Sequence, residues 1–358
     1  MKAIMCLLFF ASLLFGQEDP TSLLLRNYRP VSIYKVDRSH ISRANYPAID
    51  MHSHPYAHGA EEIAQWIQHM DESGIKKTII LTKSTGTAFD SIYALYKVHG
   101  DRFDIWCGFD LSRYEDSDFA AKAVAELERC ARAGAGGVGE ISDKGSGLIR
   151  DAAQDRRMHL DDPRMDPLWK RCGELGLPVN VHVADPIWMY QPMDSTNDGL
   201  MNAYSWRLDD RQDIRTHDQM ITTLENIVKK HPETIFVACH FANLSYDLRR
   251  LGELLDRYPN LFADISARYA ETAPIPRATA AFYEDYQDRL LYGTDMGFEK
   301  EMYQVTFRIL ESKDEHFYEI EQFDYHWPLY GLGLGKEILE KIYYRNAAGI
   351  LNHKGMEE

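Results

Sequence analysis

The chain has 358 residues, of which 45% are hydrophobic and 27% charged, which is typical of a globular protein with a large core. Lys and Arg total 40 and Asp and Glu total 55, so the formal net charge is −15. A surface this acidic argues against general attraction to nucleic acid or to anionic lipid.

The first residues have the pattern of a secretory signal peptide. Lys2 precedes an apolar run from Ala3 to Phe15, which is short for a membrane span, and Gly16 and Gln17 follow it. We expect residues 1–17 to be a cleaved signal and the protein to be secreted or periplasmic, with an uncleaved N-terminal anchor as the alternative. No second apolar segment follows, so we expect no stable membrane span in the mature chain.

Residues 18–45 are predicted to be an N-terminal extension packed against the main domain. The cysteines beyond the signal are widely spaced, and two of them fall in predicted buried strands. We therefore expect inert core thiols rather than disulfides at Cys107, Cys130, Cys172 and Cys239.

Eight short β-rich segments follow the extension. They span residues 47–52, 78–83, 103–109, 135–141, 178–183, 234–240, 261–266 and 290–295. Most are near-continuous apolar runs without polar alternation. This pattern indicates strands buried on both faces, as in a parallel sheet.

Amphipathic segments with apolar residues three to four positions apart alternate with these strands. They span residues 61–73, 118–134, 164–176, 217–231, 246–258, 276–286, 301–311 and 335–351. The alternation predicts an α/β fold, a single-domain (β/α)8 TIM barrel over residues 46–352, followed by a C-terminal tail at 353–358. Long insertions at 142–164 and 184–216 follow strands 4 and 5. Loops after strands build the active-site face of such barrels, so we expect both above the site.

Five metal-capable residues stand at or just past predicted strand ends, namely His52, His54, His182, His240 and Asp295. Residues two apart on a strand point to the same side, so His52 and His54 can coordinate the same metal ion. Imidazoles and a carboxylate on one rim predict a divalent cation, with Zn²⁺ preferred and Mn²⁺ as the alternative.

The motifs around these residues carry a resemblance to a known family. They are IDMHSH at 49–54, VNVHV at 179–183, VACHF at 237–241, LYGTDMG at 291–297 and YYRNAAGIL at 343–351. The chain resembles the amidohydrolase superfamily of metal-dependent barrel enzymes over residues 45–351. Within it, the chain is most similar to the branch of aminocarboxymuconate-semialdehyde decarboxylase and lactone hydrolases.

The resemblance implies a role for each of the five residues. His52, His54, His182 and Asp295 would bind a single metal ion, and His240 would sit beside it to orient or polarise the substrate. Asp295 would also act as general base toward a metal-activated water. The resemblance leaves a homodimer open.

Glu140, near the end of the fourth strand, leaves the number of ions open. If Glu140 bridges two ions, one is held by His52, His54 and Asp295, and His182 and His240 hold the other. Otherwise Glu140 is a carboxylate hydrogen-bonded to a ligand histidine.

Other residues are candidates for substrate binding. Arg268 and Arg207 suit a substrate carboxylate, with surface ion pairs as the alternative. Trp188 belongs to the aromatic- and methionine-rich insertion after strand 5, which we expect to be a lid, with a dimer contact as the alternative. His326, in the loop after strand 8, would close the pocket from the other side.

These features favour a metal-dependent hydrolase that attacks the carbonyl of an amide, lactone or ester in a small-molecule substrate. A non-oxidative decarboxylase on the same scaffold is the first alternative. A TatD-like nuclease is the second, and the acidic balance together with the absence of a basic stripe argues against it. We expect no nucleic-acid partner.

Overall fold

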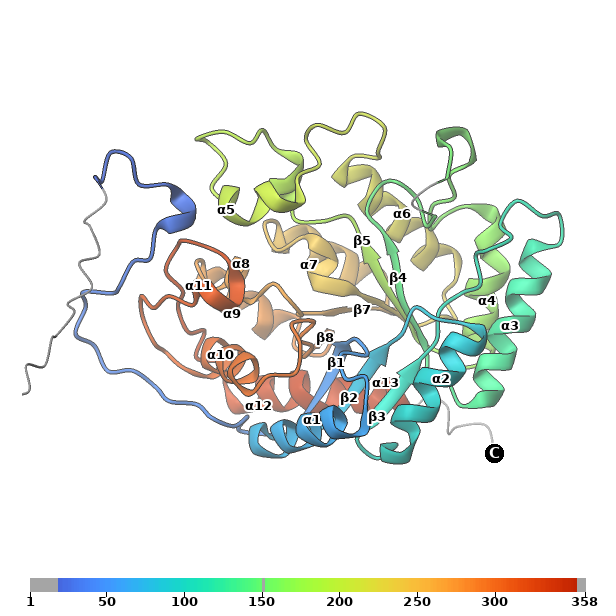
Figure 1. Cartoon of the computed structure of the whole chain (residues 1–358), viewed down its shortest axis with the longest axis horizontal. Helices are drawn as coiled ribbons and strands as arrows, with labels where there is room; N and C mark the ends of the chain where they lie inside the picture. The colour runs from blue at the N-terminus through green and yellow to red at the C-terminus, as the bar shows by residue number, and fades with distance from the viewer. Residues whose placement is uncertain (1–18, 150–151, 353–358) are drawn as a thin grey trace, which may run out of the picture.

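The computed structural model describes residues 19–149 and 152–352 (Figure 1). The predicted signal peptide at 1–17 and the predicted tail at 353–358 lie outside the described residues. Within the described ranges, no helix is both long enough and apolar enough to cross a membrane.

Eight parallel strands form the centre of the molecule. They are β1 (Ala48–Ser53), β2 (Ile75–Leu81), β3 (Phe103–Trp106), β4 (Val138–Asp143), β5 (Val179–Val183), β6 (Phe236–Ala238), β7 (Leu261–Asp264) and β8 (Leu290–Leu291). They pair in sequence order in two runs, β1 to β3 and β4 to β8. A parallel bridge from Cys107 to Val138 joins the runs on one side. On the other side the backbone N–H of Met51 donates to the carbonyl of Tyr292 at 2.9 Å, so the barrel closes and the predicted fold is confirmed.

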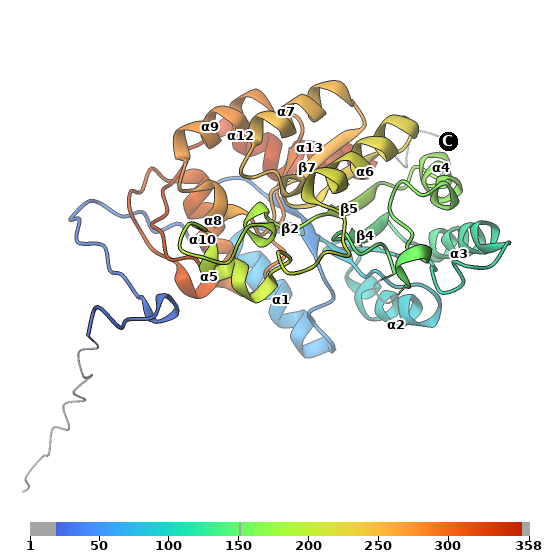
Figure 2. The same cartoon turned by 90° about the horizontal axis from the view of Figure 1, so that it is seen from above.

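Helices surround the strands, as Figures 1 and 2 show. The main ones are α1 (Ala60–Ser73), α2 (Gly86–Tyr96), α3 (Phe119–Ala133), α4 (Asp166–Glu174), α6 (His217–Lys230), α7 (Leu248–Arg257), α9 (Pro276–Asp285) and α10 (Lys300–Glu311). The last predicted helix, at 335–351, is divided into three consecutive elements in the structure. They are α12 (Lys336–Glu340), a π-helical turn η8 (Lys341–Arg345) and α13 (Asn346–Leu351). Short pieces lie in the loops, namely α8 (Tyr269–Thr272) and α11 (Ile320–Phe323).

The burial of each element explains its sequence pattern. All six residues of β1 and all five of β5 are buried, which is why these segments lack polar alternation. Helix α1 buries Ile63, Trp66 and Met70 on one face. Helix α2 was not among the predicted helices, because it buries only Phe89 and Tyr96 and so shows little apolar periodicity.

The insertion after β5 forms a compact loop over residues 184–216. It contains η5 (Ile187–Tyr190), α5 (Leu200–Ala203) and η6 (Tyr204–Trp206). Most of the N-terminal extension is exposed and loops out from the barrel (Figure 1), so it is not packed against the main domain along its length as expected. Its later part does contact the barrel, where the Ser39 N–H donates to the Asp314 carboxylate at 2.9 Å. The four predicted core thiols are free and buried, as expected.

Candidate metal centre and active site

Four of the five predicted residues meet at the carboxyl ends of the strands. The Nε2 atoms of His52 and His54 lie 3.8 and 3.1 Å from Asp295 Oδ1. His240 Nε2 lies 3.5 Å from Asp295 Oδ2. Three imidazoles, two from the end of β1 and one that follows β6, therefore surround one carboxylate.

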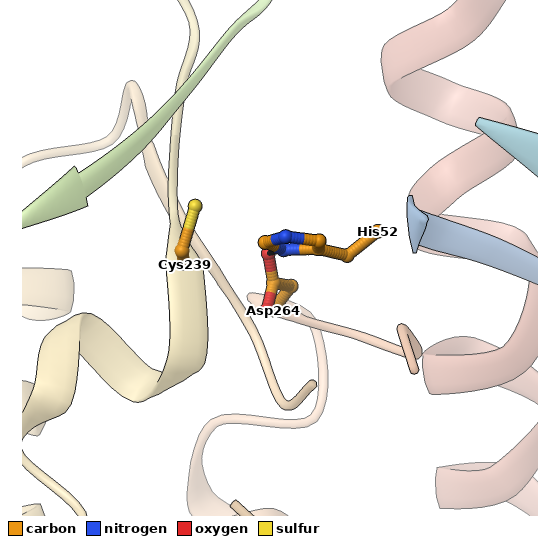
Figure 3. Close-up of side chains that lie close together, drawn as sticks. All are labelled: His52, Cys239 and Asp264. Atoms are coloured by element: carbon orange, nitrogen blue, oxygen red, sulfur yellow. Dashed lines mark hydrogen bonds and ion pairs between the residues drawn. The ribbon is translucent and has the colours of Figure 1, made fainter. Parts of the chain in front are cut away.

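His52 is oriented by a buried carboxylate of β7. Its Nδ1 donates to Asp264 Oδ2 at 2.9 Å, and both side chains are fully buried (Figure 3). The Nε2 atom of His52 is buried and has no hydrogen-bond partner among the described residues. A buried nitrogen without a partner is rare in native structures, and a cation would satisfy its lone pair.

The other two imidazoles are oriented in the same way. His54 Nδ1 donates to the carbonyl of Leu81 at 2.9 Å, and His240 Nδ1 donates to the carbonyl of Ser266 at 3.0 Å. Because a carbonyl accepts, Nδ1 carries the proton and Nε2 is left with a lone pair in the neutral ring. These lone pairs face Asp295, and this donor set fits a divalent cation.

The charges of the cluster support one another. Burial opposes protonation of His52, but the carboxylates of Asp264 and Asp295 outweigh it and raise its pKa to about 10. Burial raises the pKa of Asp264, but the neighbouring His52 outweighs burial and lowers this pKa to about 2. Burial likewise opposes ionisation of Asp295, and His52, His54 and His240 hold its pKa below the ordinary range. A cation bound here would replace the proton of His52 as the partner of these carboxylates.

His182 lies beside the cluster with a different orientation. Its Nδ1 is hydrogen-bonded to Glu140 Oε1, and its Nε2 lies 2.9 Å from the carbonyl oxygen of Ala184. Since both ring nitrogens face acceptors, the imidazole donates from both. Burial opposes its charge, but Glu140 raises the pKa of His182. Its ring packs edge-on to His240 at 4.8 Å, and its predicted role as a ligand would need the ring to turn.

Glu140 lies on β4 between His182 and His54. Its Oε2 is 2.6 Å from Lys83 Nζ and 3.5 Å from His54 Nε2. Burial favours the neutral form, but His182, His52 and Lys83 together hold the pKa of Glu140 well below its usual range. The carboxylate is also near enough to His52 and His240 to share a cation with them. Its role as a bridging ligand remains a prediction.

Cys239 directly precedes His240 and approaches the His52–Asp264 pair (Figure 3). Burial raises the pKa of this thiol, and Asp264 adds to the effect. The thiol donates to Asn180 Oδ1 at 2.8 Å, so it is a protonated neighbour of the cluster. In the sequence, only its place near the end of a predicted strand distinguishes this cysteine from the others.

A cavity of about 260 Å³ opens over His182, His240 and Asp295. The rest of its lining comes from the loops: Lys144, Asp185, Met189, Asn202, Trp206, Ala267, Arg268, Met296, Gln322, Phe323 and Tyr325. Four of these residues, Asp185, Met189, Asn202 and Trp206, belong to the insertion after β5, so this loop covers the site. Charged groups therefore stand among aromatic side chains in a small, partly enclosed space.

Of the four residues predicted to bind substrate, only Arg268 lines this cavity. Asn243 Oδ1 accepts from Arg268 Nη2 and Nε at 2.7 and 3.0 Å. Arg207 pairs instead with Asp209 at 2.8 Å and lies outside the lining.

Trp188 and His326 also lie outside the lining, one layer further out. Trp188 packs against Tyr325 and Trp327 at 6.3 and 5.8 Å between ring centroids, and the His326 ring is 5.6 Å from that of Trp327. The loop after β5 and the loop after β8 therefore meet through aromatic contacts above the site.

A closed (β/α)8 barrel with an imidazole–carboxylate cluster at the carboxyl ends of its strands defines a class of metal-dependent enzymes. The model of the amidohydrolase family matches residues 68–352, and the chain belongs to this family. The predicted resemblance is therefore confirmed. His52 and His54 precede the matched segment, so their assignment depends on the geometry above.

Solved structures support the fold. A TIM-barrel protein from Bordetella bronchiseptica is 16% identical, with a TM-score of 0.53, over 86% of this chain and 99% of that one. A 2,6-dihydroxybenzoate decarboxylase from Rhizobium is 15% identical, with a TM-score of 0.54, over 86% and 99%. A 5-carboxyvanillate decarboxylase from Novosphingobium aromaticivorans, in complex with manganese and a nitrobenzoic acid, is 15% identical, with a TM-score of 0.53, over 88% and 100%. A search of curated proteins found no match.

Proposed function

We propose that this protein is a metal-dependent decarboxylase of a small aromatic carboxylic acid. The observation that carries the proposal is the cavity above Asp295 and His240, which Arg268 lines together with Trp206, Phe323 and Tyr325. The flat ring of an aromatic substrate can pack against the aromatic side chains of the cavity, and its carboxylate can pair with the Arg268 guanidinium. The decarboxylases of similar fold act on hydroxylated aromatic acids, which is why we now prefer the first alternative over the hydrolase.

The ligands of the metal ion follow from the donor set. His52, His54 and Asp295 would hold a divalent cation, with His240 or a re-oriented His182 completing the set. When bound, the cation supplies Lewis-acid polarisation of substrate oxygens. Manganese accompanies one of the decarboxylases of similar fold, so Mn²⁺ is as good a candidate as Zn²⁺.

The chain's own residues account for the remaining requirements. Arg268 is held toward the cavity by Asn243 and would fix the orientation of an acidic substrate. Trp206, from the loop after β5, would cover the ring and exclude water. Asp295, which the surrounding imidazoles keep ionised, would first take up a proton from solvent, and the lone pair of His240 Nε2, 3.5 Å away, would accept a hydrogen bond from the protonated carboxyl group. Asp295 would then deliver this proton to the ring carbon that bears the carboxyl group of the substrate. The bond from ring to carboxyl then breaks, its electrons return to the ring, and carbon dioxide leaves.

A second candidate is the hydrolase first expected from the sequence. The observation in its favour is the low pKa of Asp295, which burial opposes and the surrounding imidazoles cause. A carboxylate that stays ionised is suited to accept a proton from water. The two candidates use the same residues but differ in where Asp295 delivers the proton it has accepted, which is the ring carbon in the decarboxylase and the leaving group in the hydrolase.

One experiment distinguishes the two reactions. The metal-loaded protein is incubated with hydroxybenzoic acids, lactones, esters and N-acyl compounds in D₂O and, separately, in H₂¹⁸O. We expect carbon dioxide release, one deuterium on the ring carbon that lost its carboxyl group, and no ¹⁸O in the product. Incorporation of ¹⁸O without carbon dioxide release would refute the decarboxylase and support the hydrolase.

A matched pair of variants tests the role of Asp295. Asp295→Asn should abolish turnover. Asp110→Asn is the control, because Asp110 also lies past the end of a strand. It should not abolish turnover, since the Asp110 carboxylate accepts from the Ser112 hydroxyl at 2.6 Å and lies outside the cavity lining. Equal loss in both variants would show that the effect is structural.

A further inference from the structure

Glu140 is a buried carboxylate whose two oxygens are both engaged. The residue is 4% exposed. Oε1 is bonded to His182 Nδ1, and Oε2 lies 2.6 Å from Lys83 Nζ. A buried carboxylate within reach of His52 and His240 would attract a cation of its own unless its charge were already neutralised.

The backbone directs Lys83 onto this carboxylate. Lys83 follows the end of β2 in the left-handed region, with φ of 58°, which is uncommon for a residue with a side chain. Its N–H donates to the carbonyl of Gly139 at 3.0 Å, which ties it to the residue before Glu140. A side chain at position 108 would place its Cβ 2.2 Å from the Lys83 carbonyl oxygen, so only glycine fits there. An unusual backbone conformation held by its neighbours indicates a functional constraint.

We propose that Lys83 is a built-in counter-ion of Glu140, which excludes a second metal ion and keeps Glu140 bonded to His182. This inference rests on the proposed metal dependence. The Lys83 ammonium already occupies Glu140 Oε2, so a second ion could use this oxygen only by displacing it, and two cations on one oxygen repel each other. Lys83 is thus a positioning residue, which acts through Glu140 rather than on the substrate.

The test counts ions instead of turnover. Metal-free protein is loaded with Mn²⁺ and gel-filtered, the manganese per chain is measured, and the electron paramagnetic resonance spectrum is recorded, because two neighbouring Mn²⁺ ions give a spin-coupled signal. We expect one ion in wild type and Lys83→Arg, and two in Lys83→Met and Lys83→Gln. In the double variant Lys83→Met/Glu140→Gln, which has no carboxylate to neutralise, we expect one again. Lys300→Met removes a surface lysine paired with Glu72 at 2.8 Å and should keep one ion.

Each outcome decides the matter. Two coupled ions in wild type, or a single ion in both Lys83→Met and Lys83→Gln, would overturn the counter-ion role. No ion in wild type would instead overturn the metal dependence itself, so the two failures are distinguishable. Circular dichroism and thermal unfolding show whether each variant is folded, and Lys83→Gln preserves a hydrogen-bond donor if Lys83→Met does not fold.

Discussion

Replacement of Asp264 by Asn tests how the cluster is oriented. Asp264 lies fully buried at the end of β7 and accepts hydrogen bonds from His52 Nδ1 at 2.9 Å, from the His240 N–H at 2.9 Å and from the Ser266 N–H at 3.1 Å. An Asn side chain is neutral and has one acceptor oxygen fewer. The variant therefore leaves either the imidazole or the two backbone donors without an acceptor.

Two routes give the same magnitude for this change. Hydrogen bonds to charged groups contribute about 1.5–3 kcal/mol each. The pKa of Asp264 falls from 3.8 to about 2, against burial and because of His52, and this shift corresponds to about 2 kcal/mol. We expect Asp264→Asn to lower the free energy of unfolding of the metal-free protein by about 2 kcal/mol and to weaken metal binding roughly 10- to 100-fold.

The pH dependence of the stability difference follows from the sign of the shift. Because the folded-state pKa of Asp264 is depressed, its stabilisation is complete above the unfolded-state value of 3.8 and is lost as pH falls toward about 2. The difference between wild type and Asp264→Asn should therefore be full at neutral pH and shrink below about pH 4.

Urea unfolding measures the stability, and competition with a chelator measures the metal affinity. Asp143→Asn is the matched control, because Asp143 is also fully buried and accepts from His159 Nδ1 at 2.7 Å, outside the cluster. It should lose stability but keep its metal affinity. Equal metal affinities in wild type and Asp264→Asn would refute the reasoning.

The other predictions concern the cavity and the ion. Arg268→Met should raise KM about 10- to 100-fold with a smaller effect on kcat, whereas Arg207→Met should change neither, as steady-state kinetics will show. Trp206→Ala opens the cover of the cavity and should raise KM severalfold and increase solvent quenching of a bound fluorescent aromatic acid; unchanged values would exclude a lid. Burial opposes the proton on His52, but Asp264 and Asp295 hold it there, so metal binding should release this proton. Isothermal titration calorimetry of metal binding should therefore give different apparent binding enthalpies in buffers of different ionisation enthalpy. Identical binding enthalpies in all buffers would contradict the raised His52 pKa of about 10. Removal of the ion by a chelator should lower Tm by roughly 5–10 °C for an ion present at about 1,000 times its Kd.

The barrel could be predicted because its strands obey one simple rule. A strand covered on both faces needs apolar residues at every position, and β1 and β5 show this directly in the sequence. Helix α2 escaped prediction because few of its residues meet the core. The candidate site residues could be predicted because they lie at the strand ends, where a His or Asp that interrupts an apolar run is easily recognised.

The orientation of the site residues could not be predicted in this way. His52 is turned by Asp264, which lies 212 positions away in the chain, and nothing in the motif around His52 indicates that partner. His182 was expected to resemble the other imidazoles, but Glu140 and the carbonyl of Ala184 hold its ring in a different orientation. Lys83 looks in the sequence like any lysine at the end of a predicted strand, and its contact with Glu140 depends on a left-handed backbone conformation that no sequence pattern indicates.

The place of the cluster in the barrel links its chemistry to its stability. His52 lies in the first strand and His54 directly follows it, and Asp295 follows the last strand, so the cluster straddles the seam at which the barrel closes. The backbone bonds there include one from Asp295 N–H to the carbonyl of His52 at 2.9 Å. An ion bound by these residues would connect the two ends of the sheet, and any ligand that binds only the closed barrel stabilises it. The residues proposed to carry the chemistry would then also hold the barrel closed, and loss of the ion would loosen the seam that positions Asp295.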